Sequence, residues 1–82
     1  MPDKLPIIKV KELIQILKKV GFQEWRQKGG HLTLYRNSDN RALTIPVHFR
    51  KDIPKGTLRV IIKEAGFKNI KEFNRLRKKK KR

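Results

Sequence analysis

Residues 22–36 read FQEWRQKGGHLTLYR and predict a β-hairpin. The first half, residues 22–27, contains Trp25, an aromatic residue of the kind that favours a strand. A Lys-Gly-Gly sequence at residues 28–30 then predicts a tight turn. We therefore expect the chain to reverse there and to form a second strand over residues 31–36.

The second strand has one apolar face. Because side chains alternate between the two faces of a strand, Leu32 and Leu34 fall on the same side. We expect that side to pack under a helix. His31, Thr33 and Tyr35 fall on the other side and are expected to face outward.

Helical and strand patterns continue outside this hairpin. Apolar residues recur at helical spacing before it, so we expect a helix over about residues 9–20 that ends at Gly21. After the hairpin, the turn formers of residues 37–40 predict a reversal into a third strand over residues 41–47, where Pro46 indicates a strand end or an edge. The stripe of the first helix consists of Val10, Leu13, Ile14 and Leu17.

Two more helices are predicted in the second half of the chain. The first covers about residues 54–65 and stops at Gly66. Asn69 can cap a short third helix, because Glu72 follows three residues later as in a capping box. This order of helix, three strands, helix and short C-terminal helix predicts an α+β fold. The stripe of the second helix consists of Leu58, Ile61, Ile62 and Ala65.

The charge of the chain indicates a polyanionic partner. With 82 residues it is one domain with a thin core, and its 23 Lys and Arg against 7 acidic residues give a net charge of +16. Such a charge points to nucleic acid, to an acidic protein or, least strongly, to an anionic membrane. We divide the chain into a domain over residues 1–74 and a basic tail over residues 75–82. The tail is a solubilising end, a phosphate-binding arm or a nuclear address.

Composition also excludes several classes of protein. No apolar run approaches the roughly 20 residues of a membrane-spanning helix, and residues 1–4 lack the apolar stretch of a signal peptide, so we expect a cytoplasmic protein with no membrane partner. The absence of cysteine excludes a disulfide framework and a thiolate metal site. Two histidines make a poor zinc site, so no metal and no cofactor are expected.

His31 is the candidate for chemistry. It follows Lys28 and two glycines in a strongly cationic chain. An imidazole has an ordinary pKa of about 6.5 and exchanges protons near neutral pH, and the amides of a glycine-rich turn can surround a phosphate. From the local sequence alone, the more frequent explanation of His31 is a polar residue on the open face of a strand.

Five short segments of the chain resemble the HicA family of toxins and occur in the family's order. Each segment is unspecific by itself, but five in the right order over residues 10–67 make a strong resemblance. They are Gly21-Phe22 after the first predicted helix, Arg26 to His31 at the turn, Thr44 to His48 at the end of the third strand, and Lys55 to Arg59 and Ala65-Gly66 in the second helix.

The resemblance implies both a fold and an activity. HicA toxins are small endoribonucleases that cleave messenger RNA and have a double-stranded-RNA-binding-domain-like fold, so we expect both here. His31 stands where the family places its catalytic histidine, and a HicB antitoxin is the implied partner. Where the family usually has a serine before that histidine, this chain has Gly30.

Further residues are candidates for RNA contact. Tyr35 falls on the same face as His31 and can stack on a base, while His48 matches a family histidine that we expect to be structural or to contact substrate. Cations at the start of the second helix attract phosphates or form an ordinary solvated surface. For Trp25 we predict packing, because a single indole in a small domain packs more often than it stacks on a base. The RNA- and phosphate-binding set is Lys28, Gly29, Gly30, Tyr35, His48, Lys55 and Arg59.

Three functions follow from these observations. In the leading hypothesis, the chain is a metal-independent endoribonuclease in which the imidazole of His31 removes a proton from the RNA 2′-hydroxyl. Gly30 in place of serine favours an alternative, a catalytically silent RNA-binding module of the same fold. A weaker third hypothesis is a basic adaptor that docks an acidic protein.

Overall fold

The fold is α+β, as predicted, and resembles a double-stranded-RNA-binding domain. The computed structural model describes residues 5–47 and 52–78. In chain order, the elements are α1 (Val10–Lys19), β1 (Gln23–Lys28), β2 (His31–Arg36), β3 (Arg41–Pro46), α2 (Lys55–Glu64) and α3 (Ile70–Lys78).

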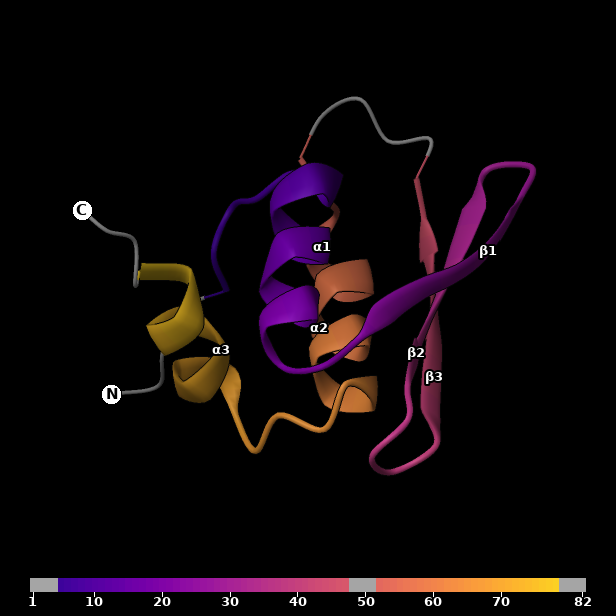
Figure 1. Cartoon of the computed structure of the whole chain (residues 1–82). Helices are drawn as coiled ribbons and strands as arrows, with labels where there is room; N and C mark the ends of the chain where they lie inside the picture. Colours follow the sequence, from indigo (N-terminus) through magenta and orange to yellow (C-terminus); the bar gives the residue numbers. More distant parts are fainter. Residues whose placement is uncertain (1–4, 48–51, 79–82) are drawn as a thin grey trace.

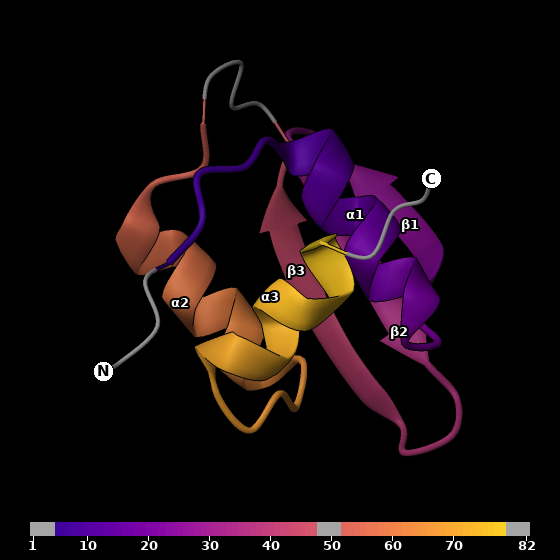
Figure 2. The same cartoon turned by 90° about the vertical axis from the view of Figure 1, so that its left-hand side faces the viewer.

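The three strands form an antiparallel sheet in the order β1-β2-β3. Helices α1 and α2 lie on one face of this sheet, and α3 lies on the outer side of these two helices, away from the sheet (Figures 1 and 2). Because each strand follows its neighbour through a short turn, β2 is the central strand. Its two ends therefore lie at opposite ends of the sheet.

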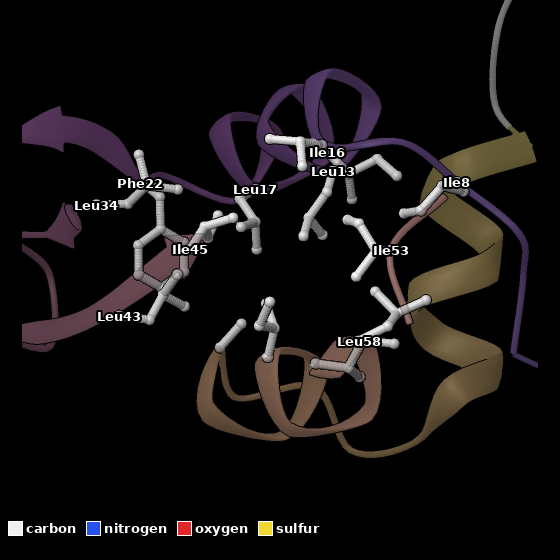
Figure 3. Close-up of a cluster of buried hydrophobic side chains, with 14 of the residues drawn as sticks. Ile8, Leu13, Ile16, Leu17, Phe22, Leu34, Leu43, Ile45, Ile53 and Leu58 are labelled. Carbon is white, nitrogen blue, oxygen red and sulfur yellow. The ribbon is translucent and has the colours of Figure 1, made fainter. Parts of the chain in front are cut away.

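The core fills the space between the sheet and the helices. Leu32 and Leu34 are buried, which confirms the predicted apolar face of β2. Ile16 is also buried, although it lies outside the predicted stripe of α1. Helix α3 packs against this side of α1, where Arg77 pairs with Glu12 at 3.7 Å. Figure 3 shows core side chains from the sheet, from α1 and α2, and from the segments next to these elements: Ile8, Leu13, Ile16, Leu17, Phe22, Leu34, Leu43, Ile45, Ile53 and Leu58.

A β-bulge changes the alternation of β1. The register of β1 against β2 shifts between Glu24 and Arg26, so Trp25 is an extra residue. Glu24 faces the helices, where its carboxylate lies 2.9 Å from the Lys18 ammonium, whereas Arg26 pairs with Thr33 of the opposite face. A regular alternation along the strand would place Glu24 and Arg26 on one face, whereas the bulge places them on opposite faces. β1 begins at Gln23 and ends at Lys28, one residue later at each end than predicted.

Both α1 and α2 end in a Schellman motif. Gly21 follows α1 with φ +101° and Gly66 follows α2 with φ +93°, a left-handed conformation that glycine adopts readily. The next residue is a phenylalanine in both places. The N–H groups of Phe22 and Phe67 donate to carbonyls five residues earlier, at 3.1 and 3.3 Å.

Arg36, at the end of β2, joins these two helix ends. Its Nη1 donates to the Val20 carbonyl at 3.0 Å and its Nη2 to the Ala65 carbonyl at 3.3 Å. The guanidinium also lies 4.6 Å from the centre of the Phe22 ring. A Cβ on the glycine after α1 or on the glycine after α2 would approach the Arg36 side chain to 3.1 or 3.3 Å. The two glycines thus leave the room that Arg36 occupies.

Asp39 completes this arrangement. Its carboxylate accepts hydrogen bonds from Arg36 at 2.8 and 3.0 Å and from Arg41 at 3.1 Å. Arg41 in turn donates to the Glu64 carbonyl at 2.9 Å, at the end of α2. The hydrogen bonds from Arg36 and then from Arg41 hold the pKa of Asp39 well below its usual range. We call Arg36, Asp39 and Arg41 the helix-end cluster.

The third helix begins as predicted. The Asn69 side chain accepts a hydrogen bond from the Glu72 N–H at 2.9 Å, so Asn69 is the cap. Glu72 accepts from the Lys68 N–H at 2.9 Å, one residue earlier than in a regular capping box. Because α3 extends to Lys78, the first residues of the basic segment are helical. No helix in the described parts of the chain is long and apolar enough to cross a bilayer.

Candidate nucleic-acid interface

The face of the sheet that points away from the helices carries the candidate residues. Leu32, Leu34, Leu43 and Ile45 are buried under the helices, so the alternate residues of β2 and β3 point the other way. No helix in the described residues covers this side (Figure 1). We call it the open face; it consists of Gln23, Trp25, Arg26 and Lys28 from β1, His31, Thr33 and Tyr35 from β2, and Ala42, Thr44 and Pro46 from β3.

The turn between β1 and β2 brings four of the predicted residues together. Lys28 and His31 are directly opposite each other across the turn, and Gly29 between them has φ +60°. The Gly30 carbonyl accepts a hydrogen bond from the Val47 N–H at 2.7 Å, which ties the turn to the end of β3. The turn is therefore fixed by the pairing of β1 with β2 and by the hydrogen bond from the residue that follows β3.

His31 lies between two strand neighbours, Lys28 on one side and Pro46 on the other, and its side chain is exposed. Cβ atoms of directly opposed residues are about 4.5–5.5 Å apart, so the Lys28 ammonium can reach an anion that contacts the imidazole. The exposed imidazole, the cation beside it and the amides of the turn form an arrangement that can bind a phosphate and transfer a proton.

Tyr35 shares the open face with His31 but not its immediate surroundings. The two residues are four positions apart on one strand, which corresponds to about 13 Å. The Tyr35 hydroxyl donates to the Asn40 side chain, and its ring centre lies 5.9 Å from that of Trp25. The structure thus places Tyr35 beside Trp25.

Trp25 does not pack in the core. Its side chain is 64% exposed, so the predicted packing role is wrong. The bulge explains the difference, because the extra residue places Trp25 on the open face beside Tyr35. The Arg26 guanidinium lies 5.6 Å from the centre of the indole, within cation–π range.

The remaining predicted contacts are separated from this face. Lys55 and Arg59 are exposed on the first turns of α2, in the helical layer. Figure 1 shows that α2 begins at the end of the molecule where the β1–β2 turn lies. Both cations are therefore near that end but not on the open face. His48, together with Arg50 and Lys51, lies outside the described residues.

Sequence reasoning missed the helix-end cluster. The sequence nevertheless indicated the position of Arg36. Side chains alternate between the faces of a strand, so Arg36 points to the same side as the buried Leu32 and Leu34, toward the helices. A charged side chain on an apolar strand face needs partners. Among the described residues, no three His, Cys, Asp or Glu side chains are grouped as a metal site would require.

Comparison with known proteins matches the chain to one family model. The family model of the HicA toxin of bacterial toxin-antitoxin systems matches residues 10–67. That span runs from the first residue of α1 to the phenylalanine that follows α2, and it includes the whole open face. Helix α3 lies beyond it. A comparison with curated proteins finds no match.

Proposed function

Because the chain belongs to the HicA toxin family of bacterial toxin-antitoxin systems, we propose that it is an endoribonuclease that cleaves messenger RNA with His31 as its catalytic base. Membership in the family makes the chain the toxin of such a system. The observation that carries the proposal is the exposed position of His31, next to Lys28 at a glycine turn.

The chemistry uses a group that RNA itself supplies. In the neutral form, the imidazole of His31 accepts the proton of the 2′-hydroxyl. The oxygen attacks the adjacent phosphorus, the bond from phosphorus to the 5′-oxygen breaks, and the 5′-oxygen leaves with a proton taken from water. The products are a 2′,3′-cyclic phosphate and a 5′-hydroxyl. DNA has no 2′-hydroxyl and is not a substrate.

The turn supplies the groups that stabilise the developing charge. Lys28 is directly opposite His31, so its ammonium can contact the non-bridging oxygens of the phosphate that His31 serves. The amides of Gly29, Gly30 and His31 are the other donors, because successive N–H groups in a glycine turn can point at one anion. Lys55 and Arg59, on the helical layer, bind more distant phosphates. This donor set needs no metal ion.

The expected protein partner is a HicB-type antitoxin. A net charge of +16 favours an acidic partner surface, and the exposed position of His31 allows such a surface to cover it. Binding of this kind is fast at low salt and weakens as salt is added.

The reaction can be tested through its products. Purified protein is incubated in EDTA with a labelled messenger RNA and, as a matched control, with DNA of the same sequence. We expect the RNA to be cut to fragments with 2′,3′-cyclic phosphate and 5′-hydroxyl ends, and the DNA to stay intact. Fragments with 3′-hydroxyl ends, or cleavage that EDTA abolishes, would rule out this mechanism.

A further inference from the structure

One cluster on the open face is not used by the proposed chemistry. It consists of Trp25, Arg26 and Tyr35, which we call the aromatic cluster. The indole is 64% exposed, its ring centre lies 5.9 Å from that of Tyr35 at an interplanar angle of 52°, and the Arg26 guanidinium lies 5.6 Å from it. Side chains that form a contiguous exposed patch, as these three do, mark an interaction site more often than a single exposed residue does.

We propose that the aromatic cluster is a stacking platform for a base of single-stranded RNA. The inference rests on the proposed function, which makes RNA the ligand of this face. Trp25 provides an exposed ring surface on which a base stacks, and Arg26 adds a cation that attracts the neighbouring phosphate.

The backbone holds the platform in place. Trp25 is the extra residue of the β1 bulge, and bulges redirect a side chain while the strands on each side stay paired. On the neighbouring strand, the Tyr35 hydroxyl is hydrogen-bonded to Asn40. The hydrogen bond holds the Tyr35 ring beside the indole. Stacking of a base there therefore costs the protein little side-chain entropy.

Charge indicates a nucleic acid as the occupant. The open face carries Arg26 and Lys28, and none of its residues in the described strands has a carboxylate. Aromatic rings combined with cations are typical of proteins that bind single strands, because every base has a face that can stack. In a duplex the bases are stacked on each other, so the platform requires an unpaired base.

The position of the platform defines which nucleotide it binds. Trp25 lies three residues before Lys28 on β1, which corresponds to about 10 Å, and Tyr35 lies about 13 Å along β2 from His31. The platform therefore holds the base of a nearby nucleotide and not a base that directly adjoins the cleaved linkage. Through this base it positions the strand across the open face.

Trp25 is the single tryptophan of the chain, so its fluorescence reports directly on the platform. The wild-type protein is titrated with a 2′-O-methyl oligouridylate, which lacks the reactive hydroxyl. An abasic oligonucleotide of equal length provides the same phosphates without bases. We expect the oligouridylate to quench the fluorescence and the abasic strand to leave it nearly unchanged.

Variants test the same point through affinity, measured by the anisotropy of a labelled oligouridylate. Trp25→Ala should weaken binding by about 5- to 150-fold, as expected for loss of one stacked base. Trp25→Phe should restore most of the affinity, because the ring is kept. Val60→Ala is the matched control, since Val60 is 53% exposed on α2 and its truncation should leave affinity unchanged.

Three results would overturn the platform. One is equal quenching by the abasic strand; a second is an unchanged affinity of Trp25→Ala. The third is that Trp25→Ala weakens binding to the antitoxin but not to RNA, which would make the aromatic cluster a protein-docking surface. If the protein cleaves RNA while Trp25 gives no response, the platform fails and the proposed function stands. If Trp25 responds to bases but RNA is not cut, the proposed function fails and the platform stands.

Discussion

The two faces of the sheet use positive charge differently. On the face toward the helices, Arg36 at the end of β2 lies 4.6 Å from the centre of the Phe22 ring and also bonds Asp39 and the carbonyl ends of two helices. On the open face, Arg26 of β1, opposite Thr33 of β2, lies 5.6 Å from the centre of the Trp25 ring. Both arginines lie over an aromatic ring.

The two arginines differ in what else they contact. The Arg36 side chain is 17% exposed, and its donors are used within the protein. Arg26 and Trp25 are both exposed, so the guanidinium and the ring can contact a ligand. A cation over an aromatic ring therefore identifies neither a structural nor a binding site by itself; the partners of its N–H groups decide which it is.

Removal of Arg36 gives the largest expected loss of stability. Arg36→Ala leaves the Val20 and Ala65 carbonyls without this donor, so we expect the free energy of unfolding to fall by about 2–4 kcal/mol. Arg26→Ala, the matched change on the open face, should cost less than about 0.5 kcal/mol. Urea denaturation measures both.

A second variant keeps this comparison informative if Arg36→Ala does not fold. Arg36→Lys retains the charge but cannot serve both carbonyls and Asp39 with one planar group. We expect an intermediate loss. Equal effects of Arg36→Lys and Arg26→Ala would contradict the role of the helix-end cluster.

The glycines that border Arg36 give the next largest effect. Gly66→Ala puts a Cβ at φ +93° and 3.3 Å from the Arg36 side chain. We expect a loss of about 1–2 kcal/mol from the left-handed conformation alone. Gly56→Ala is the control within α2, where a Cβ meets nothing within 4 Å. It should stabilise the protein by about 0.5–1 kcal/mol. Thermal unfolding of the two variants should therefore shift in opposite directions.

Acid should weaken the helix-end cluster. The pKa of Asp39 is lowered in the folded protein, mainly by the hydrogen bond from Arg36. Its contribution to stability is therefore fully present above the unfolded pKa of about 3.9 and is lost as the pH falls below it. Asp39→Asn should flatten the decline of unfolding free energy between about pH 5 and pH 2. An identical pH dependence in the two proteins would show that the ion pair adds no stability.

The smallest expected effect concerns the open face. Gly30→Ser introduces the hydroxyl that the family usually carries before its histidine. If the amides of the turn already bind the phosphate, the cleavage rate should change by less than tenfold, or about 1.4 kcal/mol. A much larger rise in the rate would favour the alternative that the natural chain is an RNA-binding module with lost chemistry.

The sequence predicted the parts of this fold that depend on local periodicity. The bounds of β2 are as predicted, and α1 and α2 are each about one residue shorter at either end. Leu32 and Leu34 are buried because an alternating pattern specifies which face of a strand meets the helices. The grouping of Lys28, the two glycines and His31 at one turn was also visible, because these residues are neighbours in the chain.

Contacts between distant residues were not visible in the same way. Arg36 bonds Val20 and Ala65, which are 16 and 29 residues away, and no local pattern specifies such partners. The bulge at Trp25 has no local signal either, because one extra residue leaves the composition of the strand unchanged. For that reason the indole was assigned to packing, whereas it is exposed.

The most direct test of the central claim is the rate of RNA cleavage by the wild type and His31→Ala, with EDTA present in both. Gln15→Ala, an exposed change on α1, is the control, and all three proteins are first shown to unfold at the same urea concentration. We predict that His31→Ala loses at least about 100-fold in rate, as expected for removal of a general base, while Gln15→Ala keeps the wild-type rate. Equal cleavage by the wild type and His31→Ala would contradict the assignment of His31 as the catalytic base.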